Sequence, residues 1–141
     1  MYVADLDTET PFAHGPHVRA IGWLDAAHPF TRGPVAADVR AHLGRFAALW
    51  TQSTVELRWR VATSPHTCTL CNAYTACGTF GVPGADVVYV VPTMITHYVD
   101  IHAYQPPAEF REALMFSPRP GTVEYEAICA PYRRKVRDPW D

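Results

Sequence analysis

The sequence predicts an α+β fold in one small domain that spans residues 1–141. Three observations support this prediction. A chain of 141 residues suffices for one compact domain and leaves little length for a second core. Hydrophobic residues make up 48% of the chain and charged residues 18%, a composition that can bury a core. Helical and strand-like periodicities occupy different parts of the chain, and 13 prolines and 8 glycines keep each element short.

The N-terminal half predicts two strands around a helix. Residues 18–24 form an apolar run that is typical of a strand, and the polar, proline-containing stretch 25–34 closes it. In residues 35–50, apolar side chains recur at spacings of three and four, which predicts a helix. In residues 54–63, apolar and polar side chains alternate, which predicts a strand with one buried face.

The C-terminal half predicts a hairpin followed by helices. Residues 74–82 and 86–91 have the composition of two strands joined by a turn at Pro83 and Gly84. A helix is expected from Thr93 to about Ala103, with Thr93 as its N-cap and two prolines after its end. Shorter helices at 107–115 and 122–130 complete the domain.

The N-terminus argues for a small soluble protein in the cytoplasm. It is acidic where a signal peptide would be basic and then apolar, and no later segment has about 18 uncharged apolar residues, so we expect no membrane partner. Stable disulfides are rare in the cytoplasm. The four cysteines, Cys68, Cys71, Cys77 and Cys129, are therefore expected to be thiols, metal ligands or core residues.

Residues 66–104 contain a set of potential zinc ligands. Two cysteines in the spacing Cys68-x2-Cys71 are followed, after 25 residues, by His97-x4-His102. A tight turn lets two thiolates converge on one ion at about 2.3 Å. The histidines converge only if the helix tightens or widens, since positions five apart on an ideal helix lie roughly 140° apart around its axis. His66 is an alternative to one of the helical histidines, whereas Cys77 and Cys129 are expected in the core.

The order of knuckle, hairpin and helix from Cys68 to His102 resembles a Cys2His2 zinc finger. The loop between the two ligand pairs of that family is usually about a dozen residues. The longer loop here implies an extended hairpin or a treble-clef-like variant. The C-x2-C pair and residues 95–110, with the pattern HYV-x2-H-x-Y-x-PP-x2-F, also resemble an uncharacterised family of small bacterial proteins, a resemblance that implies no activity.

Two other interpretations of the cysteines stay open. They could form a redox pair, but such a pair normally begins a helix, and Asn72, Tyr74 and Thr75 favour a turn and a strand. They could also be small core residues, with the histidines as ordinary polar side chains. The zinc interpretation is preferred because two ligand pairs occur in one short window.

Four protein ligands would close the zinc shell, so we expect a structural site in a binding or accessory protein. The alternative is a zinc-dependent enzyme acting on a small molecule, in which one histidine leaves the shell and Asp100 or Glu109 acts as general base. The sequence contains no HExxH, P-loop, GxGxxG or GxSxG motif, and the residues before Cys68 lack the deaminase pattern.

The partner is expected to be an unidentified protein or a small molecule. A formal charge of −2 argues against nucleic acid as the main partner. A basic cluster near the C-terminus, which we expect to be solvated surface, leaves a weaker nucleic-acid option. It consists of Arg133, Arg134, Lys135 and Arg137.

Two further groups of residues are not expected to form sites. The acidic residues and histidines near the N-terminus have no fixed spacing and are expected to be exposed. They are Asp5, Asp7, Glu9, His14, His17 and His28. Several aromatic residues at periodic positions are expected in the core rather than around a ligand. These are Trp23, Trp50, Trp59, Tyr89 and Tyr98.

Overall fold

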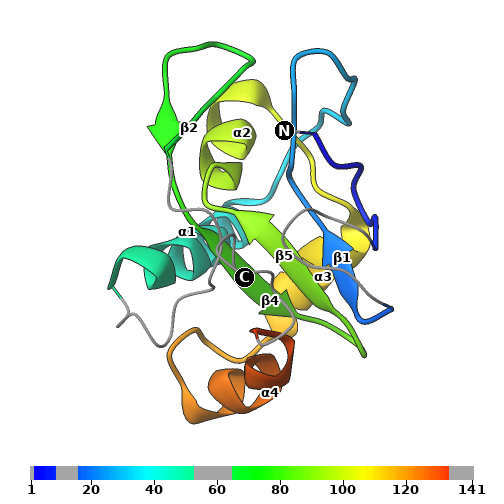
Figure 1. Cartoon of the computed structure of the whole chain (residues 1–141), viewed down its shortest axis with the longest axis vertical. Coiled ribbons are helices and arrows are strands. Elements are labelled where there is room, and N and C mark those ends of the chain that lie inside the picture. Colours follow the sequence, from blue (N-terminus) through cyan, green and yellow to red (C-terminus); the bar gives the residue numbers. More distant parts are fainter. Residues whose placement is uncertain (1, 9–15, 53–64, 134–141) are drawn as a thin grey trace, which may run out of the picture.

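A three-stranded sheet in the order β1-β5-β4 forms the centre of the fold (Figure 1). The computed structural model describes residues 2–8, 16–52 and 65–133. Strand β1 (Val18–Ala20) runs parallel to β5 (Val88–Pro92), and β5 runs antiparallel to β4 (Thr79–Pro83). A second, two-stranded sheet pairs β2 (His66–Thr67) with β3 (Thr75–Ala76). The described residues thus confirm an α+β fold.

The predicted hairpin is present, but its first strand is interrupted. Residues 74–82 form two strands, β3 and β4, because Gly78 has a φ of 107° that only glycine adopts readily. The turn between β4 and β5 is closed by a hydrogen bond from the Gly84 N–H to the Val87 carbonyl, 2.8 Å long. Every residue of β4 and β5 is buried, although β4 is an edge strand of the sheet, because α1, α3 and α4 pack on it.

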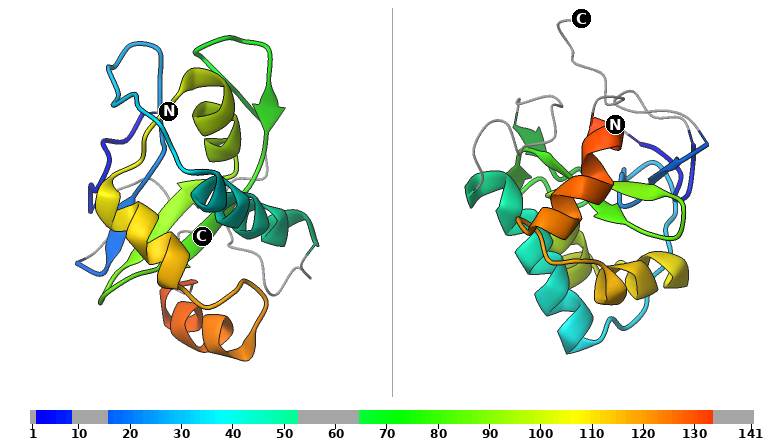
Figure 2. Two further views of the ribbon diagram at one scale, coloured as in Figure 1. Left: turned by 180° about the vertical axis from the view of Figure 1, so that it is seen from behind. Right: turned by 90° about the horizontal axis from the view of Figure 1, so that it is seen from below.

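Four helices lie in the described part of the chain. They are α1 (Ala37–Gln52), α2 (Ile95–His102), α3 (Ala108–Phe116) and α4 (Val123–Arg133). Figure 2 shows α1 and α3 crossing the same face of the sheet, where both contact β4 and each other. Helix α4 contacts β4 as well, and the Tyr125 hydroxyl donates to the Gly81 carbonyl. None of these helices is long and apolar enough to cross a membrane.

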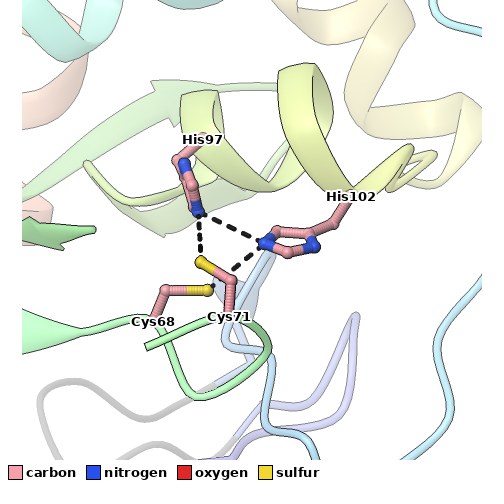
Figure 3. Close-up of side chains that lie close together, drawn as sticks. All are labelled: Cys68, Cys71, His97 and His102. Carbon is pink, nitrogen blue, oxygen red and sulfur yellow. Dashed lines mark hydrogen bonds between the residues drawn. The ribbon is translucent and has the colours of Figure 1, made fainter. Parts of the chain in front are cut away.

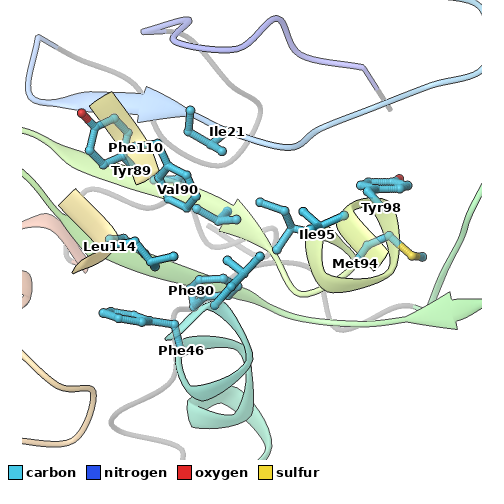
Figure 4. Packing of buried hydrophobic residues seen from close by; sticks show 14 of the residues in the cluster. Ile21, Phe46, Phe80, Tyr89, Val90, Met94, Ile95, Tyr98, Phe110 and Leu114 are labelled. Carbon is cyan, nitrogen blue, oxygen red and sulfur yellow. The ribbon is translucent and has the colours of Figure 1, made fainter. Parts of the chain in front are cut away.

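The hydrophobic core lies between the sheet and the helices (Figure 4). Phe46 of α1 packs against Phe80 of β4, with ring centroids 6.4 Å apart, and against Tyr125 of α4 at 5.9 Å. Met94 and Ile95, at the start of α2, belong to the same cluster and are almost fully buried. The core therefore holds the N-terminal end of α2 in place.

Two predicted details are wrong and one cannot be compared. Thr93 does not cap α2. Its hydroxyl donates to the Cys77 carbonyl at 2.7 Å, and the helix begins after Met94 without a side-chain cap. The first strand ends at Ala20 rather than residue 24, before Gly22 with its φ of 79°. The strand predicted at 54–63 lies outside the described residues.

Candidate metal centre

Cys68 and Cys71 lie on the loop that joins β2 to β3. The Cys68 N–H donates to the Tyr74 carbonyl at 2.9 Å, and the Asn72 N–H donates to the Cys68 carbonyl at 2.7 Å. These bonds close the loop into a tight turn. Asn72 completes it with a φ of 55°, in the left-handed region that asparagine tolerates better than most residues. The turn brings both Sγ atoms to the same side of the loop (Figure 3).

His97 and His102 lie on α2, facing the cysteine loop (Figure 3). The last turn of this helix is wider than an α-helical turn, because the Ala103 N–H donates to the carbonyl of Tyr98, five residues earlier. Tyr104 donates to the same carbonyl at 3.1 Å. The widened turn reduces the angle between positions 97 and 102, and their Nε2 atoms lie 3.2 Å apart.

The four side chains form a compact cluster of donor atoms. The Cys68 Sγ lies 3.5 Å from the His102 Nε2, the Cys71 Sγ lies 3.4 Å from the His97 Nε2, and all four atoms lie within 4.8 Å of one another. In a tetrahedral zinc site, neighbouring sulfur and nitrogen ligands are separated by about 3.3 to 3.8 Å, as follows from the bond lengths. The cluster is therefore compatible with a metal ion.

The surroundings of the cluster differ from one side chain to the next. Cys68 is fully buried, whereas Cys71, His97 and His102 are half-buried. Burial raises the pKa of the Cys68 thiol. Burial, and then the neighbouring His102, lower the pKa of His97. The imidazole is thus favoured in the neutral form that binds metals, whereas the thiolate needs a cation to offset its desolvation.

Tyr74 adds a contact that the sequence did not indicate. Its ring stacks on the imidazole of His97, with centroids 4.3 Å apart and planes 5° from parallel. This stacking restricts the rotation of the ring whose Nε2 faces Cys71. An aromatic residue three positions after a C-x2-C pair is the only sequence signal for it, and such a signal is weak.

The other candidate ligands lie outside the cluster. His66 is on β2, opposite Ala76, and is not among the four converging side chains. Cys129 is fully buried in the core, as predicted, whereas Cys77 is only half-buried. Asp100 is exposed, and Glu109 accepts a hydrogen bond from the Tyr89 hydroxyl at 2.8 Å. Within the described ranges, no second group of three or more such donors converges.

The N-terminal polar residues do not all behave as predicted. Asp5 is half-buried rather than exposed, because its carboxylate accepts hydrogen bonds from the Gly22 N–H and the Tyr104 hydroxyl. His28 is exposed and stacks on Tyr2. Glu9, His14 and the basic cluster from Arg134 onward lie outside the described residues.

The aromatic residues that are described lie in the core, as predicted. Tyr89 and Tyr98 are almost fully buried. Trp23 is partly buried against the core, and its indole N–H donates to the Val90 carbonyl at 3.0 Å. The side chains of Trp50 and Trp59 are outside the described part of the structure.

A family model with the description "Domain of unknown function (DUF7919)" matches residues 1–115, which include both β-sheets, α2 and all four members of the cluster. Searches of the curated proteins and of the solved structures gave no match.

Proposed function

The chain belongs to the family described as Domain of unknown function (DUF7919), and we propose that it is a zinc-binding protein with a structural Cys2His2 site. In this proposal the ligands are Cys68, Cys71, His97 and His102. The observation that carries it is the convergence of two thiols and two imidazoles within 4.8 Å. Bound zinc would supply the positive charge that stabilises two thiolates in a partly buried place.

The chemistry of the donors favours zinc over other metals. Two sulfur and two nitrogen donors in a tetrahedral arrangement suit zinc, whereas magnesium and calcium prefer oxygen. Iron–sulfur clusters are usually held by four cysteines, and only two cysteines occur in this group.

The number of donors favours a structural role. A catalytic zinc usually has three protein ligands and one open position, and four Cys and His side chains would leave none. The ion would connect the loop between β2 and β3 to both ends of α2, through His97 in its first turn and His102 at its last residue. The donor pairs in contact are 26 and 34 residues apart in the sequence. The protein would then act as a binding or accessory protein.

The same geometry supports the zinc-finger-like character of residues 66–104. A cysteine-bearing loop, the β4–β5 hairpin and a helix with two histidines follow one another in the order of a zinc finger. We further propose that residues 1–141 fold as one domain, since one core cluster includes side chains from Val18 to Cys129.

The test is metal analysis of the purified, tag-free chain together with cobalt substitution. We expect one equivalent of zinc, and for the cobalt form the visible bands of a tetrahedral site with two thiolates. Cys71→Ser should lose most of the metal, whereas Cys77→Ser should retain it. Cys77 is a matched control because it is a half-buried cysteine outside the cluster.

Two results would contradict the proposal. Absence of metal from the wild-type chain, with no uptake of added zinc or cobalt, would return the cysteines to a redox or packing role. A cobalt spectrum of a five-coordinate site with bound water would favour the zinc-dependent enzyme. In that case a search for hydrolytic activity on small molecules would follow.

A further inference from the structure

A pocket of about 510 Å³ is lined by residues of the β4–β5 turn, α3 and α4. Figure 1 shows these elements toward the opposite end of the fold from α2. Its wall is only slightly more apolar than polar. The apolar part includes Pro83, Val87, Ala113, Phe116, Pro118 and Ile128. This volume lies within the range of pockets that bind drug-sized ligands or large side chains.

Two large apolar side chains on the rim of this pocket are exposed to solvent. Phe116, the last residue of α3, is 82% exposed, and Ile128 of α4 is 42% exposed. Single exposed apolar residues are common on proteins, but exposed aromatic and aliphatic side chains together at one partly apolar pocket are typical of an interaction surface. Phe116 is therefore an exposed ring at the edge of a pocket that is large enough to hold the same ring of another molecule.

The rim also carries charges of both signs. Arg19 of β1 lies on one part of it, and Glu109 and Glu112 of α3 lie on another. The Arg19 guanidinium donates to the carbonyls of Pro16 and Val18, each at 2.8 Å, which fixes its position. Glu112 is exposed and has no ion pair within the described residues.

We propose that this face is the contact surface of a dimer of the chain, with two copies related by a two-fold axis. In such a dimer the same patch of both copies is in contact, so the patch must be complementary to itself. This patch contains both a protruding ring and a recess, and both a cation and two carboxylates. A partner with charge of one sign would meet repulsion at one part of the rim, whereas a second copy can pair opposite charges at both.

Each copy would place its Phe116 ring in the pocket of the other and its Arg19 near the partner's Glu112. The ring would leave water on contact, and buried aromatic residues at the centre of an interface contribute most of the binding energy. The two charge pairs lie at the rim and would fix the orientation of the copies rather than supply most of the affinity.

The first test is sedimentation equilibrium of the full, metal-loaded chain over a range of concentrations. We expect a reversible monomer–dimer equilibrium, and we expect Phe116→Ser to raise the dimer dissociation constant by at least about tenfold. Val123→Ser is the matched control, since Val123 is 86% exposed but does not line the pocket. Its dissociation constant should equal that of the wild type.

The second test uses charge reversal. Arg19→Glu and Glu112→Arg should each weaken self-association, because each homodimer would then contain two like-charge contacts. A mixture of the two variants should form a heterodimer, since both contacts in it pair opposite charges. This recovery requires that residues 19 and 112 of different copies are in contact.

A wild-type chain that stays monomeric at all concentrations would overturn the proposal. The proposal would also be wrong if Phe116→Ser and Val123→Ser weakened the dimer equally, because the contact would then not involve the pocket. Circular dichroism spectra and metal content of each variant would be recorded, so that loss of self-association in a folded, metal-loaded variant reports the interface alone.

Discussion

Asp5 connects the N-terminal segment to the core through two hydrogen bonds. Its Oδ1 accepts from the Gly22 N–H at 3.0 Å, and its Oδ2 accepts from the hydroxyl of the fully buried Tyr104 at 2.7 Å. Burial raises the pKa of Asp5, although both hydrogen bonds oppose this rise. Burial and the charge of Asp5 raise the pKa of Tyr104. Asp5 thus has a structural role, and burial destabilises the ionised form of its carboxyl group.

Asp5→Ala should lower the free energy of unfolding by about 2–3 kcal/mol at pH 7, because two buried donors lose their acceptor. Asp5→Asn should change it by less than about 1 kcal/mol, because the amide oxygen can still accept from Gly22. Urea denaturation of both variants and the wild type measures these differences. Equal losses in the alanine and asparagine variants would show that the hydrogen bonds do not matter.

The raised pKa of Asp5 also gives a direction for the effect of pH. The folded state favours the protonated carboxyl, so this stabilising contribution is complete below the unfolded pKa of about 3.9 and is lost as pH rises through the folded pKa. Relative to Asp5→Asn, the wild type should therefore lose stability between pH 4 and pH 7. A relative gain over this range would contradict the direction of the shift.

Single residues differ in how far the sequence indicates their roles. The spacing of Cys68, Cys71, His97 and His102 was enough to identify the cluster. The sequence did not indicate the contacts of Asp5 or Tyr74, because the residues that they contact come close only in the folded structure. The residues bonded to Asp5 are 17 and 99 positions away, and Tyr74 stacks on His97 across the hairpin.

The loop between β2 and β3 depends on one backbone position with a positive φ. Asn72→Val should lower the free energy of unfolding by about 1–2 kcal/mol, because a β-branched side chain is strained at a φ of 55°. Asn72→Gly should remain close to the wild type. Thermal unfolding of the two variants and the wild type measures these differences in stability.

Ala73→Val is the control for the loop variant. Ala73 is exposed, lies in the same loop and has no positive φ, so its substitution should leave the melting temperature nearly unchanged. If the two valine variants were equally destabilised, the cause would be the new side chain in the loop rather than the backbone conformation of residue 72.

The types of the elements were easier to predict than their ends. The apolar periodicity of α1 and the pair of strands around Pro83 sufficed to predict these elements. The interruption at Gly78 and the late start of α2 come from tertiary contacts. Thr93 donates its hydroxyl to Cys77 and its N–H to the Gly78 carbonyl, so it is held by the β3–β4 connection and cannot cap the helix.

Most of the core of the molecule lies apart from the Cys68, Cys71, His97 and His102 cluster. Of the four side chains in the cluster, only Cys68 belongs to the set of buried core residues. The N-terminal part of α2 is held by Met94, Ile95 and Tyr98, which are all buried in that core. By contrast, β2 and β3 have two residues each and pair mainly with each other.

If the cluster binds zinc as proposed, removal of the ion with a chelator should therefore loosen one region and leave the rest folded. We expect faster amide hydrogen exchange in residues 66–76 and at the end of α2, with protection kept in β4, β5 and α3. The free energy of unfolding should fall by several kcal/mol, because the energy of metal binding adds to that of folding. Hydrogen exchange followed by mass spectrometry, with and without chelator, measures both the extent and the place of the change.

This expectation differs from the behaviour of small zinc fingers, which are unfolded without their metal because they have almost no other core. Here the sheet and three helices bury Phe46, Phe80, Phe110 and Leu114 away from the cluster. Loss of protection throughout the chain on chelation would mean that the metal is required for the whole fold. Exchange in residues 66–76 could also stay unchanged after removal of the metal has been verified. The core alone would then hold the cysteine loop, and the structural role proposed for zinc would be wrong.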